Sequence, residues 1–375
     1  MDAGTGKATA AKQTPERSVT TWWLAFFLFL TSGIAWVVSI PILLVSLGGS
    51  LMPHVGWSWG TVVAVAMFSV LVQFDQRIAA TVVPAVAFGS AFLASGWQAF
   101  AFAFVASAMT ALNGVKRVCP PNPRLLNFQC RYYQGYHKRS ELFASPDTVR
   151  RGQSLYACHP HGILSVGWIS NVVWSRRFHD LVGRCFYLID GTLRNKGLLA
   201  RPFCDAFEGP HGGLRDTSRE TMNSLMERGE SVCLIPGAYQ EATLFEYGRD
   251  RVALRGRKGF VKLCLRHGYR LHPVYTFGES QTYRTVGGFE RLRLRLNRNG
   301  IPTVAFWGLS WFPLLPRRGC ELVTCVGPAL ELPKIPEPSA ADVDEWHAKY
   351  VTALCELFDR SKEEAGYPHA QLEVL

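Results

Sequence analysis

Hydrophobic positions are concentrated in the first third of the chain, in three long blocks that contain no Asp, Glu, Lys or Arg. A helix needs about 20 residues to cross the hydrocarbon core of a bilayer. The third block is long enough for two short helices joined by a turn at Ser95-Gly96. The pattern therefore predicts two to four membrane-spanning helices within residues 19–112, at about 22–47, 57–74, 78–94 and 97–112.

Basic residues around these blocks predict the orientation of the membrane region. Lys7, Lys12 and Arg17 precede the first block, and Lys116 follows the last one. Cytosolic segments next to membrane helices carry an excess of Lys and Arg, so we expect both termini in the cytosol. Residues 1–18 are polar and predict a disordered cytosolic tail rather than a signal peptide.

After residue 113 the pattern changes to short apolar runs separated by segments with helical periodicity. The runs predict strands at 155–158, 185–189, 232–235, 271–277, 303–306 and 321–326. Capping-box patterns predict helix starts at Thr217-x-x-Glu220 and Ser339-x-x-Asp342, and a third helix is expected at 257–267. Residues 113–375 therefore predict an α/β domain, a mixed sheet flanked by helices, in the cytosol.

Charge and cysteine content narrow the class of protein. The chain has 40 Lys and Arg against 29 Asp and Glu, a formal charge of +11. A basic nucleic-acid-binding stripe would not leave a third of the chain uncharged, so we expect no nucleic-acid partner. The ten cysteines begin at Cys119 and form no Cys-x-x-Cys pair. Neither a metal site nor a disulfide framework is indicated, and a reducing cytosolic setting fits best.

The sequence His159-Pro160-His161-Gly162 follows an apolar run and is the strongest candidate for chemistry. An imidazole takes a proton from a hydroxyl near neutral pH, because its ordinary pKa is about 6.5. The proline stiffens the turn, and the glycine allows close approach of backbone or substrate. The alternative is a buried turn histidine that only satisfies carbonyl groups.

A second candidate follows the strand predicted at 232–235. The segment 236–241 contains Gly237 in a turn and ends in Glu241. A carboxylate at this position of an α/β sheet lies at the edge where such folds build their sites. Glu241 could orient a histidine or stabilise its protonated form. The alternative is a solvated loop carboxylate.

A third candidate is a basic helix. Lys258, Lys262 and Arg266 are spaced four apart and share a helical face, and Arg257 precedes them. The helix N-terminus adds backbone donors for an anion such as a phosphate. The alternative is a solvated basic face against lipid headgroups.

Two further features have weaker functional readings. The strand 271–277 ends in Gly278-Glu279, and its expected role is structural. Cys158 adjoins the histidine turn and is conceivable as an acyl-accepting thiolate. A cysteine on an apolar run is more often part of the core.

Together these segments resemble the type 2 diacylglycerol O-acyltransferase family, which also contains monoacylglycerol and wax-alcohol acyltransferases. The resemblance runs from about residue 78 to the C-terminus. It rests on the histidine turn, Arg215-Asp216-Thr217, the Pro-Gly-Ala-Tyr-Gln-Glu segment at 236–241, the run from Arg-Lys-Gly-Phe at 257 to Phe-Gly-Glu at 279, and Val-Gly-Pro at 326–328. Ala238 and Cys264 depart from the pattern, where the family has glycine and alanine.

The resemblance implies a multi-pass membrane enzyme of the endoplasmic reticulum, often reaching lipid droplets, with a glycerolipid-acyltransferase-like domain. It transfers an acyl group from acyl-CoA, its co-substrate, to diacylglycerol and needs no cofactor. Monoacylglycerol or a long-chain alcohol remains an alternative acceptor. A lipid-binding or scaffolding protein is the non-enzyme alternative, and the chain is compatible with a homo-oligomer.

The candidate residues suggest one mechanism as a hypothesis. His161 is the expected general base, because some family members keep only the second histidine, and the alkoxide then attacks the thioester directly. Glu241 is the expected orienting carboxylate, and backbone amides near Gly162 or Gly237 are expected to hold the oxyanion. Arg257, Lys258, Lys262 and Arg266 are expected to bind the CoA phosphates. The His-x4-Asp spacing of glycerophosphate acyltransferases is absent, since Val166 and Leu164 stand five residues after the two histidines.

Overall fold

A computed structural model describes residues 121–375, apart from 125–126, 128–129, 131–132, 192–193, 195–203, 206, 299–303 and 311–314. The predicted tail and the predicted membrane helices lie outside the described residues. Within the described part, no helix combines the length and the apolar composition needed to cross a membrane.

The centre of the fold is a mixed sheet, as predicted, in the strand order β1-β10-β7-β2-β5-β3-β4. The five strands from β7 to β4 are parallel, β10 is antiparallel to β7, and β1 is parallel to β10. The strands are β1 (Arg139–Phe143), β2 (Ser154–His159), β3 (Cys185–Ile189), β4 (Gly212–Asp216), β5 (Ser231–Leu234), β7 (Arg270–Phe277) and β10 (Glu321–Val326), and the short β11 (Leu330–Glu331) also pairs with β7.

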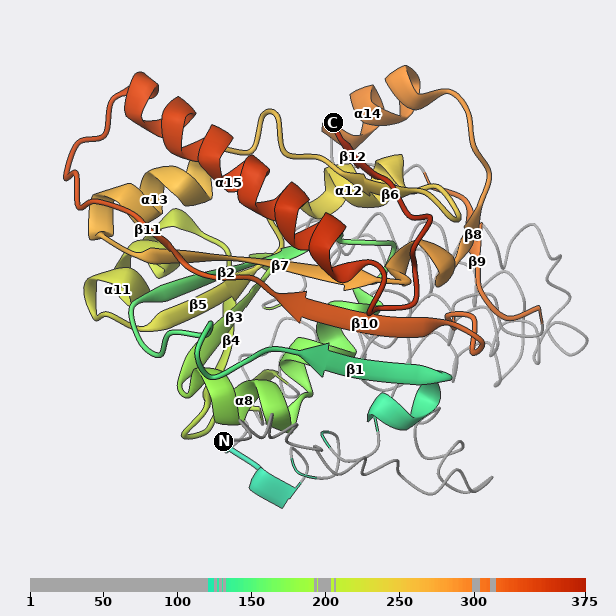
Figure 1. Cartoon of the computed structure of the whole chain (residues 1–375), viewed down its shortest axis with the longest axis horizontal. Coiled ribbons are helices and arrows are strands. Elements are labelled where there is room, and N and C mark those ends of the chain that lie inside the picture. Colours follow the sequence, from blue (N-terminus) through green and yellow to red (C-terminus); the bar gives the residue numbers. More distant parts are fainter. Residues whose placement is uncertain are drawn as a thin grey trace, which may run out of the picture.

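Helices cover both faces of this sheet (Figure 1). One apolar core lies between the sheet and the helices α11 (Arg219–Glu227), α13 (Gly259–His267) and α15 (Ala340–Ser361). The second core lies on the other face, under α7 (Val166–Trp168), the π-helix η3 (Ile169–Val173) and α8 (Arg176–Val182). Strands buried on both faces are continuously apolar, which is why these runs lack the alternation of a half-exposed sheet.

Smaller elements complete the domain beside the sheet. β6 (Asp250–Val252) pairs with the C-terminal strand β12 (Leu372–Val374), and β8 (Arg284–Thr285) pairs with β9 (Phe306–Trp307). The remaining helices are α12 (Ala238–Leu244), α14 (Glu290–Arg298) and the 3-10 turns η2 (Tyr133–Tyr136) and η4 (Glu279–Gln281).

Most predicted strands and the Ser339 capping box are confirmed, and three details need correction. Only Phe306 of the run 303–306 is in a strand, and its partner is β8 rather than the main sheet. Ser218, not Thr217, caps α11, because the Thr217 amide still donates to Ile189 at the end of the β3–β4 pairing. The segment 236–241, expected as a loop, enters the first turn of α12.

Candidate active site

The histidine turn lies at the C-terminal end of β2, between its neighbours β7 and β5 in the middle of the sheet. His159 is the last residue of the strand, and 1% of its surface is exposed. Its Nε2 lies 2.8 Å from the hydroxyl of Tyr350 on α15. The ring is enclosed and its Nε2 is paired, whereas its Nδ1 has no hydrogen-bond partner among the described residues. Burial of this ring favours a role in holding the turn over direct contact with a substrate.

His161 has different surroundings in the same turn. It is half-buried, and its Nδ1 lies 3.1 Å from the carbonyl oxygen of Gly162. Nδ1 must carry the proton to donate to that carbonyl, so Nε2 keeps a lone pair and accepts. Burial lowers the pKa of His161, against the smaller opposing effects of the Gly162 carbonyl and the Glu241 carboxylate. The ring is therefore neutral near pH 7, as a general base must be.

Glu241 is buried in the first turn of α12 and is directed at the histidine turn. One carboxylate oxygen accepts the backbone amide of His161 at 2.5 Å, and the other accepts the amide of Ala253 at 3.0 Å. The second oxygen is also 3.6 Å from Nδ1 of His159. Glu241 thus contacts the backbone of His161, whereas the ring that it approaches belongs to His159.

Glu279 is a second buried carboxyl beside the turn, at a position that the sequence analysis treated as structural. Its oxygens accept the backbone amides of Val166 at 3.1 Å and Gly167 at 2.6 Å. Burial raises the pKa of Glu279 to about 8, although these two amides oppose the shift. The signal available in the sequence was its place directly after β7, since β7 and β2 end at the same edge of the sheet.

The glycines of the site are required by these two carboxyls. Gly162 has φ +63°, and a Cβ there would lie 2.1 Å from an oxygen of Glu279. A Cβ on Gly237 would lie 2.0 Å from the side chain of Glu241. Both positions therefore exclude side chains for a steric reason. Among the described residues, the Gly162 amide donates no hydrogen bond.

Tyr350 on α15 is the other site residue that the sequence motifs did not indicate. Its ring packs against Phe260 at the start of α13, with 5.1 Å between ring centroids. It therefore connects His159 to the basic helix through two aromatic rings.

The four predicted phosphate-binding residues differ in how available they are. Lys258 precedes α13 and forms an ion pair with Asp344 at 2.6 Å. Lys262 is exposed, and Arg266 is half-buried near the C-terminal end of the helix. Arg257 is half-buried, and its Nε has no hydrogen-bond partner within the described residues. The structure places these cations beside α15 and not in contact with the histidine turn.

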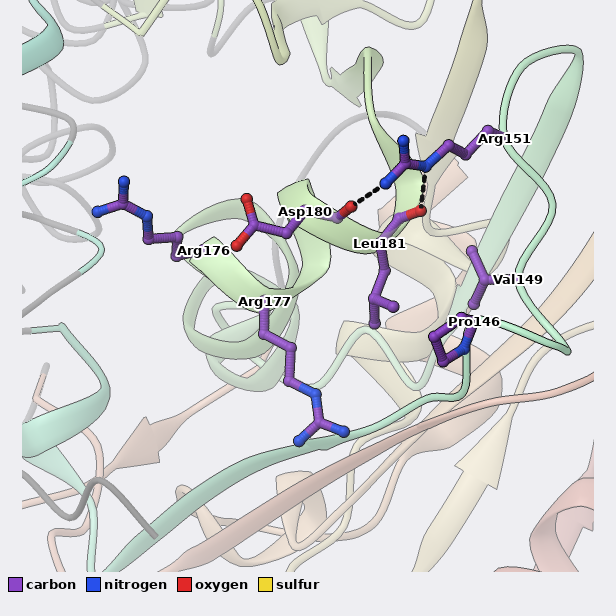
Figure 2. Close-up of a pocket in the computed structure, with 7 residues that line it drawn as sticks. All are labelled: Pro146, Val149, Arg151, Arg176, Arg177, Asp180 and Leu181. Carbon is purple, nitrogen blue, oxygen red and sulfur yellow. Dashed lines mark hydrogen bonds between the residues drawn. The ribbon is translucent and has the colours of Figure 1, made fainter. Parts of the chain in front are cut away.

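Two other features fit catalysis poorly. The Cys158 sulfur is buried 3.5 Å from that of Cys233, and burial raises the pKa of the Cys158 thiol well above its ordinary value. A neutral thiol in the core is a poor nucleophile. The arginine-lined hollow in Figure 2, formed by Arg151 and helix α8, lies at the start of β2, the end opposite to His159.

Comparison with known proteins agrees with the motifs at this site. A family model described as diacylglycerol acyltransferase matches residues 126–375. The chain belongs to the diacylglycerol acyltransferase family. The matched residues include every candidate site residue named above, from His159 to Arg266.

Individual relatives of this family show the extent of the similarity. Diacylglycerol O-acyltransferase 2 of Dictyostelium discoideum is 30% identical over 246 residues, which cover 62% of this chain and 72% of the relative. The human protein of the same name is 30% identical over 264 residues, covering 65% and 66%. Human 2-acylglycerol O-acyltransferase 3 is 31% identical over 235 residues, covering 56% and 64%.

Proposed function

We propose that this protein transfers a fatty acyl group from acyl-CoA to the free hydroxyl of diacylglycerol and so forms triacylglycerol. The proposal draws on the family and on relatives named diacylglycerol O-acyltransferase 2. The observation that carries the chemistry is the 3.1 Å contact between Nδ1 of His161 and the Gly162 carbonyl, because an Nδ1 that donates there leaves Nε2 as an acceptor. Monoacylglycerol is the second candidate acceptor, because a 2-acylglycerol acyltransferase is similarly related.

In the proposed mechanism, Nε2 of His161 removes the proton of the acceptor hydroxyl as its oxygen attacks the thioester carbonyl. The tetrahedral intermediate collapses by breaking the carbon–sulfur bond, and the imidazolium returns its proton to the CoA thiolate. General-base catalysis of this kind contributes about 10² to 10⁴ in rate. No acyl-enzyme is needed, in keeping with the neutral, buried thiol of Cys158.

The buried carboxyls act on the turn and not on the substrate. Glu241 fixes the His161 amide, and Glu279 packs under Gly162 while binding the two amides that begin the next helix. Together they hold the Gly162 amide in one orientation, and we assign it as a donor to the developing oxyanion. Gly237 supports this arrangement by leaving room for the Glu241 side chain.

We assign phosphate binding to Arg257, Lys262 and Arg266. These three side chains form no ion pair among the described residues. Lys258 joins them once it exchanges its ion pair with Asp344 for a phosphate.

We assign the enzyme to the endoplasmic reticulum membrane, with the spans predicted in residues 19–112 and both termini in the cytosol. We propose access to lipid droplets as well, on the ground of the family resemblance. The composition of the first third of the chain, which has no charged residue in its long apolar blocks, supports membrane anchoring.

The acceptor is tested by incubating the purified full chain with labelled oleoyl-CoA and, in separate reactions, diacylglycerol, monoacylglycerol or hexadecanol. Labelled triacylglycerol from diacylglycerol is the expected product. Product from one of the other acceptors alone would assign the sister activity instead. Absence of product from all three, in folded protein, would contradict the proposed function and favour a lipid-binding or scaffolding role.

A further inference from the structure

The exposed large apolar side chains of the described residues gather around helix α14. They come from α12 and the turn after it, from the β8–β9 pair, and from α14 and the turn before it. The residues are Tyr239, Tyr247, Val286, Phe289, Leu292 and Trp307. Phe289 is 83% exposed and Val286 58%. These elements lie together on one side of the molecule (Figure 1). We call this set the α14 surface.

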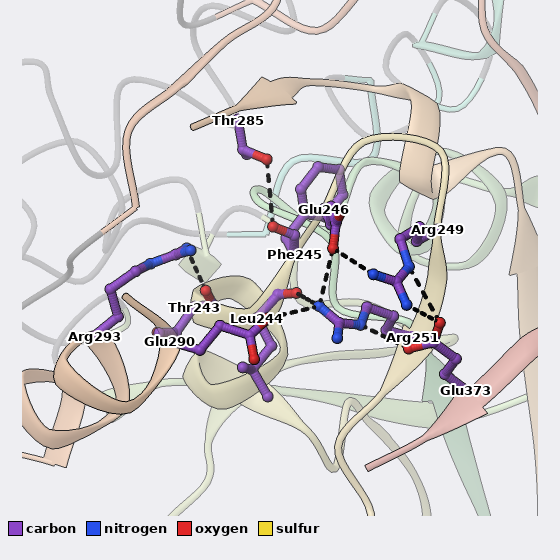
Figure 3. Close-up of polar contacts among 10 residues, drawn as sticks. All are labelled: Thr243, Leu244, Phe245, Glu246, Arg249, Arg251, Thr285, Glu290, Arg293 and Glu373. Atoms are coloured by element: carbon purple, nitrogen blue, oxygen red, sulfur yellow. Dashed lines mark hydrogen bonds and ion pairs between the residues drawn. The ribbon is translucent and has the colours of Figure 1, made fainter. Parts of the chain in front are cut away.

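Helix α14 is held to the domain by polar contacts instead of an apolar face. Arg293 donates to the carbonyl of Thr243, and Asn297 donates to the carbonyl of Tyr239 at 3.2 Å. Glu290 accepts from Arg251 at 3.1 Å, within the network that Figure 3 shows. Of the α14 side chains that the structure describes, none is buried, including three leucines. This is the reverse of a helix that packs its leucines on a core.

The backbone conformation at the start of α14 also indicates that the exposure of its apolar side chains serves a function. Phe289 has φ +53° and follows Gly287-Gly288. A bulky aromatic residue in the left-handed region is strained, and such strain tends to be kept where it serves function. Here it accompanies the most exposed large apolar side chain among the described residues.

Charge decides what kind of partner fits. Arg284, Arg291 and Arg295 are exposed among these apolar side chains, and Arg291 and Arg295 form no ion pair within the described residues. Protein–protein interfaces are also enriched in aromatic residues and Arg, so a protein partner is the competing outcome that the test must distinguish. The headgroup layer of a membrane accepts apolar side chains and unpaired arginines side by side, and anionic lipids attract the latter.

We propose that the α14 surface lies in the headgroup layer of an anionic phospholipid membrane. The proposal extends the proposed function, because the acceptor is a membrane lipid and α14 packs on α12, the helix that carries Glu241. Docking through α14 would bring the lipid surface next to the element that positions His161. It adds a peripheral contact to whatever anchoring residues 19–112 provide.

Photocross-linking tests this placement without needing turnover. Benzoylphenylalanine is introduced at Phe289 in the full chain, which is reconstituted in vesicles of phosphatidylcholine with about one fifth phosphatidylserine. The matched control carries the probe at Glu345, an exposed position on α15. We expect cross-links to phospholipid from position 289 and none from 345. Cross-links from 289 to a second copy or to residues 19–112, or no cross-links at all, would overturn the proposal.

Kinetic measurements provide a second test of the proposed membrane contact. The double substitution Phe289→Ser with Leu292→Ser should lower kcat/KM for diacylglycerol presented in those vesicles by about tenfold, because apolar insertion is lost. Glu345→Gln should leave kcat/KM unchanged. With a dispersed short-chain diacylglycerol the double variant should match the parent protein. Equal loss with both acceptors would show a defect in the site and not in docking. An inactive parent protein would contradict the proposed function. The cross-links would still show whether the α14 surface contacts phospholipid.

Discussion

His159 and His161 occupy one turn, but their surroundings assign them different tasks. His159 is enclosed and paired with Tyr350, whereas His161 is half-buried with one ring nitrogen open. The sequence could indicate the turn and its chemistry, because histidines around a proline after an apolar run are conspicuous. It could not indicate which ring is enclosed, since that depends on α15, almost 200 positions away along the chain.

Ala238 is the residue where backbone strain can be measured. It has φ +44°, where the family pattern has glycine. An L-residue with a Cβ costs roughly 1–2 kcal/mol in the left-handed region. Ala238→Gly should therefore raise the unfolding midpoint of the purified protein. Ala348→Gly, in the exposed middle of α15, should lower it, because glycine weakens a helix. A lower midpoint for Ala238→Gly would contradict this account.

Glu279 should make stability depend on pH. Its pKa is raised by burial to about 8 from the ordinary 4.5. Between these values the folded protein keeps the proton and the unfolded chain has lost it, so stability falls as pH rises through this window. Glu279→Gln, which cannot ionise, should remove that part of the slope in unfolding midpoints between pH 5 and 8. The exposed control Glu345→Gln should retain it, and identical slopes for Glu279→Gln and the parent protein would refute the assignment.

At the scale of elements, α15 contributes to the site as well as to the core. Its capping box was predictable, because it is a local pattern, and the structure confirms it. The position of Tyr350 over His159 was not predictable, because packing of a C-terminal helix on β2 is a tertiary property. The helical start of segment 236–241 was missed for a related reason, since Pro-Gly favours a turn in isolation.

Tyr350→Phe tests the link between α15 and the histidine turn. Loss of the hydroxyl leaves Nε2 of His159 buried without its partner, at a cost of about 1–3 kcal/mol. We expect kcat to fall several-fold. The control Tyr269→Phe removes a buried hydroxyl that donates to the carbonyl of Glu230 at 2.8 Å, just before β7 begins and so at the end of that strand opposite to the site, and should affect stability but not kcat. Equal effects of both variants on kcat would show that Tyr350 has only a structural role.

At the scale of the whole molecule, the mixed sheet gathers distant segments at one edge. The ends of β2, β5 and β7 bring together the histidine turn, Glu241 and Glu279. Strand composition predicted most of the sheet, and the family motifs predicted its candidate site. The hydrogen bonds of Glu241 and Glu279 could not be predicted from the sequence. Glu241, the expected orienting carboxylate, accepts the backbone amide of His161 and lies 3.6 Å from the ring of His159, an arrangement that depends on how α12 leaves the sheet.

The most direct test of the account is the rate of triacylglycerol formation by the full chain carrying His161→Ala or His161→Gln. Unfolding midpoints measured in parallel establish that each variant is folded. We predict a loss of about 10² to 10⁴ in kcat, the contribution expected of a general base, with midpoints close to that of the parent protein. Near-normal turnover by both folded variants would contradict the assignment of His161 as the base.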